Sequence, residues 1–295
     1  ETLPGNWRRA IDIEALEDHL KKDIKKDIKG ILIIHTETAT GITNDLPAIR
    51  SAIDSADHPG LLIVDTVAAA GTVDYRMDEW GIDVTVGASQ KGLMMPPGIG
   101  IVAAGEKALS ATKESTMPRL YWDWKTRLEA EHYRKFCGTA PQLMVFGMRE
   151  ALNMLFEEGL ENVFERHRVL AAATHAAVEV WGQAGTLSLN AVEPKERSNG
   201  VTTILTSDGI DAGQFRDICR DEMMVGLGGG LGDLSGKAFR IGHMGDINAP
   251  MLYAALSAVE STLGYLNIKY ASGGVTAAIE YITNVKKNET GPFSF

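Results

Sequence analysis

The sequence predicts an α/β fold in which a mainly parallel sheet is sandwiched by helices, and two patterns support this. Short, continuously apolar segments alternate with segments in which apolar residues recur at helical spacing. This alternation is typical of parallel strands buried beneath helices on both faces. Polar residues also follow directly after three of the apolar segments. Because ligands of open α/β sheets bind outside the carboxyl ends of the strands, the same three places predict the functional site.

The first half of the chain supplies the predicted sheet. Apolar residues at helical spacing predict its helices, short apolar runs predict its strands, and a segment with Pro and Gly predicts a turn. In chain order we expect a helix over 13–25, a strand over 30–35, a helix over 46–56, a strand over 61–65 and a strand over 83–87.

The second half predicts a smaller C-terminal α+β domain. Two long helices are expected over 140–155 and 160–181, with Gly159 between them, and the second helix opens the small domain. The further elements are a strand over 201–205, a helix over 212–221, a strand over 238–241 and a helix over 251–266. We therefore expect a large domain over 1–159 and a small domain over 160–295.

The overall composition excludes several classes of protein. A net charge of −10 argues against nucleic-acid binding, because no basic surplus is available to neutralise phosphates. Cys137 and Cys219 are too few for a disulfide framework and indicate a reducing, cytoplasmic compartment. The longest apolar runs are much shorter than the roughly 18 residues of a membrane helix. The first residues lack both a signal-peptide pattern and a Met, so we expect the chain to begin inside a longer protein.

Lys91 is the first candidate catalytic residue. It follows a predicted strand and precedes Met-Met-Pro-Pro-Gly98, in which the prolines block a helix and the glycine allows positive φ. A lysine on such a shaped, partly desolvated loop can have its pKa lowered and act as a Schiff-base nucleophile. Most lysines are solvated surface groups, so this residue alone does not indicate a function.

Asp65 is the second candidate, because a carboxylate that ends an apolar strand is costly unless it meets a charge or hydrogen-bond donors. The protonated pyridine nitrogen of pyridoxal 5'-phosphate (PLP) is such a partner, and a carboxylate beside it keeps the ring an electron sink. A helix N-cap is an equally good reading of an Asp at this position.

Six motifs then occur in order along the chain. They are His35-Thr-Glu-Thr-Ala-Thr-Gly41, Asp65-Thr-Val67, Trp80-Gly-Ile-Asp83, Ser89-Gln-Lys-Gly92 with Pro96-Pro-Gly98, Tyr121-Trp-Asp-Trp124 and Phe239-Arg-Ile-Gly-His-Met-Gly245. Together, over about residues 6–282, they resemble the alanine–glyoxylate and serine–glyoxylate aminotransferases, which are class V members of the fold-type I PLP enzymes. The resemblance implies the PLP-transferase fold and a homodimer or higher homo-oligomer.

The resemblance also implies a role for each site residue. Lys91 would form the Schiff base with PLP and then carry the 1,3-proton shift between aldimine and ketimine. Arg240 would bind the substrate α-carboxylate, for which the bidentate geometry of arginine is suited. The remaining cofactor-binding residues would be Asp65 at the pyridine nitrogen, Val67 and Thr38 at the ring, Gln90 at the phosphate, and Thr139 at the phosphate of a neighbouring subunit. A preceding N-terminal segment would supply the phosphate-binding turn and the second ring-stacking residue.

Without the resemblance, several of these residues have plainer interpretations. Arg240 is compatible with a surface strand, Val67 with the core and Gln90 with a solvated loop. His35 and His243 lack a second ligand at zinc-like spacing, so we expect polar histidines with satisfied hydrogen bonds and no metal site. The glycine-rich residues 226–232 lack the strand–loop–helix context of a dinucleotide loop, and we expect a flexible segment beside the substrate.

The predicted reaction is a ping-pong transamination from a small amino acid, such as serine, alanine or aspartate, to glyoxylate, which yields glycine. One alternative is a PLP-dependent lyase or decarboxylase of the same fold. Another is a truncated, cofactor-free remnant that serves as a binding or dimerisation module. A cysteine desulfurase would need a mobile reactive thiol, and Cys137 is a poor candidate for it.

Overall fold

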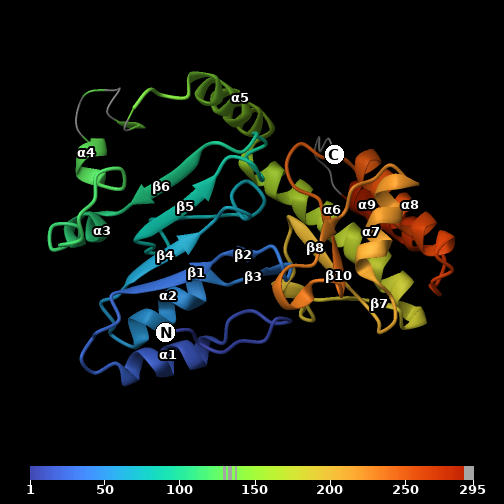
Figure 1. Cartoon of the computed structure of the whole chain (residues 1–295), viewed down its shortest axis with the longest axis horizontal. Helices are drawn as coiled ribbons and strands as arrows, with labels where there is room; N and C mark the ends of the chain where they lie inside the picture. The colour runs from blue at the N-terminus through green and yellow to red at the C-terminus, as the bar shows by residue number, and fades with distance from the viewer. Residues whose placement is uncertain (129–130, 132–134, 137, 289–295) are drawn as a thin grey trace.

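The computed structural model describes residues 1–128, 131, 135–136 and 138–288. Figure 1 shows two sheets, one built from the first third of the chain and one from the C-terminal half, with a long helix running between them. Cys137, the poor desulfurase candidate, lies outside the described residues.

The N-terminal sheet has four strands in the order β1 (Gly30–Ile34), β4 (Leu61–Asp65), β5 (Val84–Ala88) and β6 (Gly100–Ala104). The first two pairs are parallel and the last is antiparallel. The predicted mainly parallel sheet is therefore confirmed, whereas β6 was not predicted. Two short helices follow it, α3 (Glu106–Ala111) and α4 (Trp124–Leu128).

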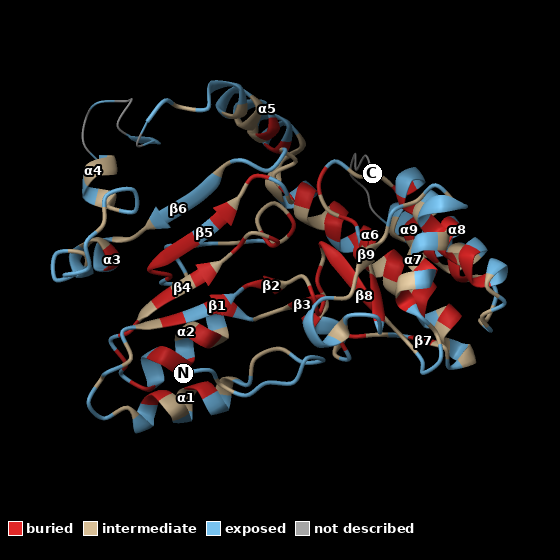
Figure 2. Cartoon of the chain, in the orientation of Figure 1, coloured by how far each residue is buried: buried red, intermediate tan, exposed pale blue. Residues whose placement is uncertain are grey.

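Helices cover only one face of this sheet among the described residues. α1 (Ile13–Lys22) and α2 (Leu46–Ser55) pack on Ile31, Ile33 and the neighbouring β4 residues. On the opposite face Leu32 is 76% exposed, and Figure 2 shows β1 and β6 with exposed segments. The predicted α/β fold with a mainly parallel sheet is confirmed, and the described helices cover one face of this sheet. Apolar residues on both sides of a strand indicate two faces to bury, but the described helices supply a cover for one.

The C-terminal half contains an antiparallel sheet in the order β7 (Leu187–Leu189), β8 (Val201–Thr206), β10 (Ala238–Gly242) and β9 (Gly228–Gly229). Its core includes Trp181, Phe215 and Phe239, all fully buried. The surrounding helices are α6 (Leu160–Trp181), α7 (Ala212–Asp221), α8 (Ala249–Tyr265) and α9 (Gly274–Asn288), with 3-10 turns η2 (Gly182–Ala184), η3 (Pro194–Glu196) and η4 (Gly232–Leu234). α5 (Gln142–Glu158) precedes α6 and lies beside β5 and β6 (Figure 1). Among the described residues, none of the helices is long and apolar enough to cross a membrane.

A small hairpin joins the two sheets. Its strands, β2 (Thr36–Glu37) and β3 (Ile42–Thr43), extend β1 toward β8 (Figure 1). Gly41, at φ +70°, packs so closely that a Cβ there would lie 3.1 Å from the amide nitrogen of Thr203. The Thr203 hydroxyl donates to the carbonyl of Ala39 at 3.0 Å. The hairpin thus packs directly on the C-terminal sheet, and the predicted boundary at residue 160 stays a prediction.

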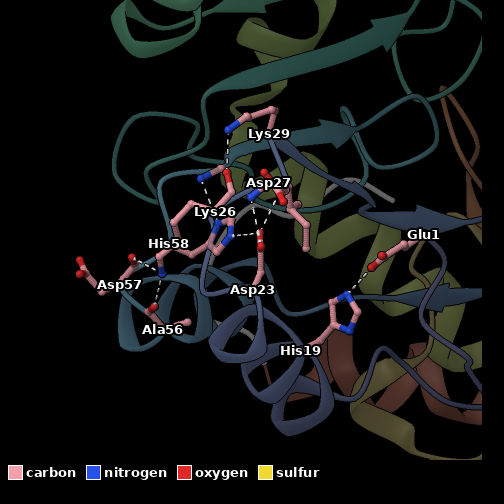
Figure 3. Close-up of polar contacts among 11 residues, drawn as sticks. Glu1, His19, Asp23, Lys26, Asp27, Lys29, Ala56, Asp57 and His58 are labelled. Carbon is pink, nitrogen blue, oxygen red and sulfur yellow. Dashed lines mark hydrogen bonds and ion pairs between the residues drawn. The ribbon is translucent and has the colours of Figure 1, made fainter.

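Asp23 fixes the connection between α1 and β1 (Figure 3). Its carboxylate accepts the backbone N–H groups of Asp27 at 3.0 Å and Ile28 at 2.8 Å, and it contacts the His58 Nε2 at 3.1 Å. His58 Nδ1 accepts the N–H of Gly60, so Nε2 carries the proton that Asp23 accepts. These bonds, led by the one from Ile28, lower the pKa of Asp23 to about 2.

We expect Asp23→Ala to lower the thermal unfolding midpoint by a few degrees at neutral pH, because two backbone donors and one imidazole lose their acceptor. The wild-type advantage is present above the unfolded pKa of 3.8 and is lost as the pH falls through about 2. Asp27→Ala is the control, since the Asp27 side chain is exposed and only its backbone enters the network. Equal midpoints for the two variants would contradict this role.

Candidate active site

Lys91 lies on a loop whose two ends are joined by hydrogen bonds within the loop. Ser89, fully buried at the end of β5, donates its hydroxyl to the carbonyl of Pro96 at 2.8 Å and accepts the N–H of Ile99 at 3.3 Å. The N–H of Met94 donates to the Lys91 carbonyl at 2.9 Å, and Met94 has φ +62°. The side chain of Lys91 is half-buried. The loop is therefore shaped by local bonds, as the Pro-Pro-Gly sequence indicated.

Two glycines press this loop against the turn that follows Asp65. A Cβ at Gly92 would lie 2.2 Å from the carbonyl oxygen of Ala70, and one at Gly71 would lie 2.8 Å from the carbonyl oxygen of Gly92. Side chains at either position would force the two backbones apart. This contact brings the Lys91 loop and the Asp65 turn together, and no local pattern in the sequence indicates it.

Asp65 is the last residue of β4, in register with Ile34 of β1 and Val86 of β5. Its Oδ1 accepts the N–H of Val67 at 2.8 Å, and a turn rather than a helix follows. The N-cap interpretation therefore does not apply. Among the described residues, neither the second oxygen of Asp65 nor the amine of Lys91 has a hydrogen-bonding partner.

Arg240 reaches from β10 toward the hairpin of the N-terminal sheet. Its Nε donates to the carbonyl of Gly229 at 2.7 Å and its Nη1 to the carbonyl of Thr38 at 2.8 Å. Among the described residues, Nη2 has no acceptor. Burial lowers the pKa of Arg240; the charge of Glu37 opposes this effect, and that of Arg216 adds to it. Arg240 is thus a partly desolvated, oriented guanidinium and not a surface strand residue.

The remaining predicted residues lie in less defined surroundings. Val67 and Thr38 are half-buried, whereas Gln90 and Thr139 are exposed. The contact between Thr38 and Arg240 uses the backbone carbonyl of Thr38, not its hydroxyl. Within the described part of the chain, no hydrogen bond joins Thr139 to the other predicted site residues.

His35 supports Asp65 from the covered face of the sheet. Its backbone N–H donates to the carbonyl of Asp65 at 2.9 Å, and its ring packs 5.7 Å from Tyr75 and 6.3 Å from Trp80. Burial lowers the pKa of His35 to about 4. The expectation of a satisfied histidine is wrong here, because Nδ1 has no partner among the described residues. His243 does match it, since Nε2 contacts Thr202 and Nδ1 contacts the carbonyl of Asn199, each at 2.8 Å.

A cavity of about 490 Å³ lies beside the hairpin, between it and the N-terminal segment. Leu3, Trp7, Glu37 and Asn44 are among the residues that line it. None of Lys91, Asp65 and Arg240 lines this cavity, although Glu37 precedes Thr38. Asp65 and Lys91 instead lie at and just beyond the carboxyl ends of β4 and β5, where α/β folds bind ligands.

Comparison with known proteins supports the same interpretation. The family described as aminotransferase class-V matches residues 3–231. The serine–glyoxylate aminotransferase of Methylorubrum extorquens is 40% identical over 282 residues, which are 94% of this chain and 69% of that protein. The L-aspartate–glyoxylate aminotransferase of Paracoccus denitrificans is 37% identical over 276 residues, 93% of this chain and 69% of that protein. The crystal structure of ureidoglycine–glyoxylate aminotransferase from Bacillus subtilis superposes with a TM-score of 0.84 at 30% identity, covering 96% of this chain and 72% of that one. With its fold, its motif order and these similarities in agreement, this chain belongs to the class-V aminotransferase family.

Proposed function

We propose that this chain is an amino acid–glyoxylate aminotransferase that binds PLP through Lys91. The observation that carries the proposal is the Gly71–Gly92 contact, which holds the amine-bearing loop against the turn of Asp65. The similar proteins named above differ in their amino donor but share glyoxylate. Their names therefore support glyoxylate as acceptor more firmly than any one donor.

The side chains of Lys91, Asp65 and Val67 fit PLP. A carboxylate with one uncommitted oxygen ends a parallel strand, and an uncommitted amine lies on the adjoining loop. An acidic group suits the protonated pyridine nitrogen, and an unpaired amine suits the aldehyde. Val67, half-buried in the turn after Asp65, adds an apolar side chain for a ring face.

Each residue then has a defined task. When bound, PLP supplies an electron sink that stabilises negative charge at the substrate α-carbon. Lys91 would hold the cofactor covalently, and its amine would serve as the base that moves the proton at the substrate α-carbon. Asp65 keeps the pyridine nitrogen protonated through the oxygen that Val67 does not occupy. Arg240 binds the substrate carboxylate through Nη2, while Gly229 and Thr38 fix its other nitrogens.

The donor that we propose is a small amino acid: serine, alanine or aspartate. Residues 226–232 border Arg240, because a Cβ at Gly228 would lie 3.2 Å from the Cβ of Arg240. These glycines leave room beside the guanidinium. A screen of the three donors against glyoxylate, with glycine formation measured, would identify the preferred one.

We also propose a homodimer, in which Thr139 contributes to the neighbouring cofactor site. The segment that begins at Thr139 leads into α5, which exposes 87% of Leu143 and 68% of Phe146. Exposed apolar side chains of this size on one helix are typical of an interaction surface. Analytical ultracentrifugation of the holoenzyme would test this, and a monomer at micromolar concentration would argue against it.

The reaction class is tested by adding a donor amino acid alone to the holoenzyme. A transaminase converts its bound cofactor stoichiometrically to the amine form and releases one keto acid per site. Release of carbon dioxide or ammonia with the absorbance band unchanged would instead indicate the lyase or decarboxylase alternative. A preparation that takes up no PLP would support the cofactor-free remnant.

We expect Arg240→Ala to raise the KM for both amino acid and keto acid by roughly 10- to 100-fold, because a charge-assisted hydrogen bond contributes about 1.5–3 kcal/mol. Arg240→Lys keeps the charge without the planar fork and should recover only part of the loss. Arg216→Ala is the matched control, since Arg216 lies beside Gly229 and donates to the carbonyl of Leu227. If only Arg216→Ala raised the KM values, Arg216 and not Arg240 would be the residue that binds the substrate carboxylate.

A further inference from the structure

The loop after β10 is held at a single glycine by two side chains of α6. The N–H of Gly245 donates to the Nε2 of His167 at 3.0 Å, and its carbonyl accepts from the Nη1 of Arg166 at 2.8 Å. Arg166 is 5% exposed and His167 is fully buried. Both backbone polar groups of Gly245 are thus committed to buried partners.

These two side chains are themselves fixed. Arg166 makes a bidentate ion pair with Glu158, at 2.6 Å from Nε and 2.8 Å from Nη2, and also donates to the carbonyl of Ile247 at 3.2 Å. The Nδ1 of His167 lies 2.7 Å from the carbonyl of Val163. Because Gly245 donates to Nε2, the single ring proton of neutral His167 lies on Nδ1. A buried arginine is costly unless such partners satisfy it, so this cluster has one well-defined arrangement.

On its other side, Gly245 meets the Lys91 loop. A Cβ at Gly245 would lie 3.6 Å from the Cγ of Met94 and 3.9 Å from the carbonyl oxygen of Lys91. Met94 in turn donates its N–H to that carbonyl. The opposite flank of the loop rests on the Asp65 turn through Gly71 and Gly92. The Lys91 loop is therefore held between two backbones, one from each sheet.

We infer that Arg166 and His167 are positioning residues, which act through Gly245 to fix the backbone of Lys91 relative to Asp65. This inference rests on the proposed function, because it assigns their effect to the reactive amine. Loss of either contact frees the Gly245 loop to move, and Lys91 loses one of its two supports. Neither side chain touches the predicted reacting groups.

The first test compares Arg166→Met with Arg168→Met in the holoenzyme. Arg168 lies two residues further along α6 and also pairs with a glutamate, Glu165. Its side chain is 46% exposed, and its other partner is the Tyr281 hydroxyl and not Gly245. We expect Arg166→Met to lower kcat by roughly 10²-fold with KM changed much less, since small misplacements of a reacting group have effects of that size. When the absorbance of the bound cofactor is followed against pH, the midpoint of the change should also shift in Arg166→Met. Arg168→Met should alter neither, and Arg166→Lys should recover part of the loss.

The second test does not depend on replacing a buried charge. Gly245→Ala and Gly209→Ala impose similar backbone strain, because φ is +90° at Gly245 and +88° at Gly209. Only the first adds a methyl group beside Met94 and Lys91, since a Cβ at Gly209 meets nothing within 4 Å. We expect Gly245→Ala alone to shift the absorbance midpoint. In the cofactor-free protein it should also increase amide hydrogen exchange in the peptide containing Lys91 to Met95.

The outcomes separate this inference from the proposed function. If borohydride reduction of the wild-type holoenzyme does not label Lys91, the proposed function fails. If Lys91 is labelled but Arg166→Met and Gly245→Ala behave like their controls, in kinetics, absorbance and exchange, the positioning role is overturned. Changes confined to the Arg166 and Gly245 variants would support it.

Discussion

Lys91→Ala is expected to lower kcat by on the order of 10⁶-fold, the size of effect that follows removal of a covalent catalytic residue. It should also abolish the covalent adduct that borohydride traps. The fold should be retained, because the amine of Lys91 has no partner among the described residues and its removal leaves no buried group unsatisfied. Peptide mapping of the reduced holoenzyme, stopped-flow absorbance and a thermal unfolding curve measure the three effects.

Lys107→Ala is the matched control for the loss of a lysine. Lys107 donates to the carbonyl of Gly60 at 3.1 Å and lies 3.4 Å from Asp83, so it is tied to the sheet away from the Lys91 loop. We expect it to reduce stability slightly and to leave the trapped adduct intact. Recovery of the adduct on another lysine of the wild type, or full turnover by Lys91→Ala, would contradict the assignment.

The long elements could be predicted from local pattern because their periodicity extends over enough residues. The strands at 30–34 and 61–65 are continuous apolar runs, and the observed bounds differ from the predicted ones by at most one residue. β2, β3 and β9 have two residues each, too few for any period to appear. α9 follows Gly273 and begins with Gly274, Val275 and Thr276, which are weak helix formers, so its pattern did not indicate a helix.

The site divides in the same way. Lys91 and Asp65 could be identified because each follows a strand, and the chemistry of an amine or a carboxylate at a strand end is unusual. The close approach of Gly71 to Gly92 could not, since it joins two backbones that are distant in sequence and depends on how the loops pack. The same holds for the carbonyl groups that orient Arg240, which belong to Gly229 and Thr38.

Acidification from pH 7.5 to pH 4.5 is expected to remove most of the free energy of unfolding. Burial is the main cause that lowers the pKa of four histidines: His35, His167 and His243 to about 4, and His175 to about 3. Each is neutral in the folded chain but takes up a proton near pH 6.5 once unfolded. The stability that these histidines contribute is therefore fully present above pH 6.5 and is lost as the pH falls to about 4, or to about 3 for His175.

The size of this effect follows from linkage. A shift from 6.5 to about 4 corresponds to about 3 kcal/mol for one histidine. Three such groups together approach the whole free energy of unfolding of a domain, about 5–15 kcal/mol. The carboxylates cannot explain a loss in this window, because a group such as Asp23, whose pKa is lowered to about 2, loses its contribution only below pH 3.8. Urea midpoints measured at half-unit pH steps would show the slope.

His35→Phe isolates one of these contributions. A phenyl ring suits the aromatic surroundings formed by Tyr75 and Trp80, and it removes the unpaired Nδ1. We expect little loss of stability at pH 7.5 and a smaller loss than the wild type at pH 5, since one fewer group takes up a proton on unfolding. His19→Gln is the control for the loss of a histidine, because His19 pairs with Glu1 at the surface and is not one of the four buried histidines. A wild-type slope in His35→Phe would mean that protonation of His35 does not oppose folding, and that the acid transition has another source.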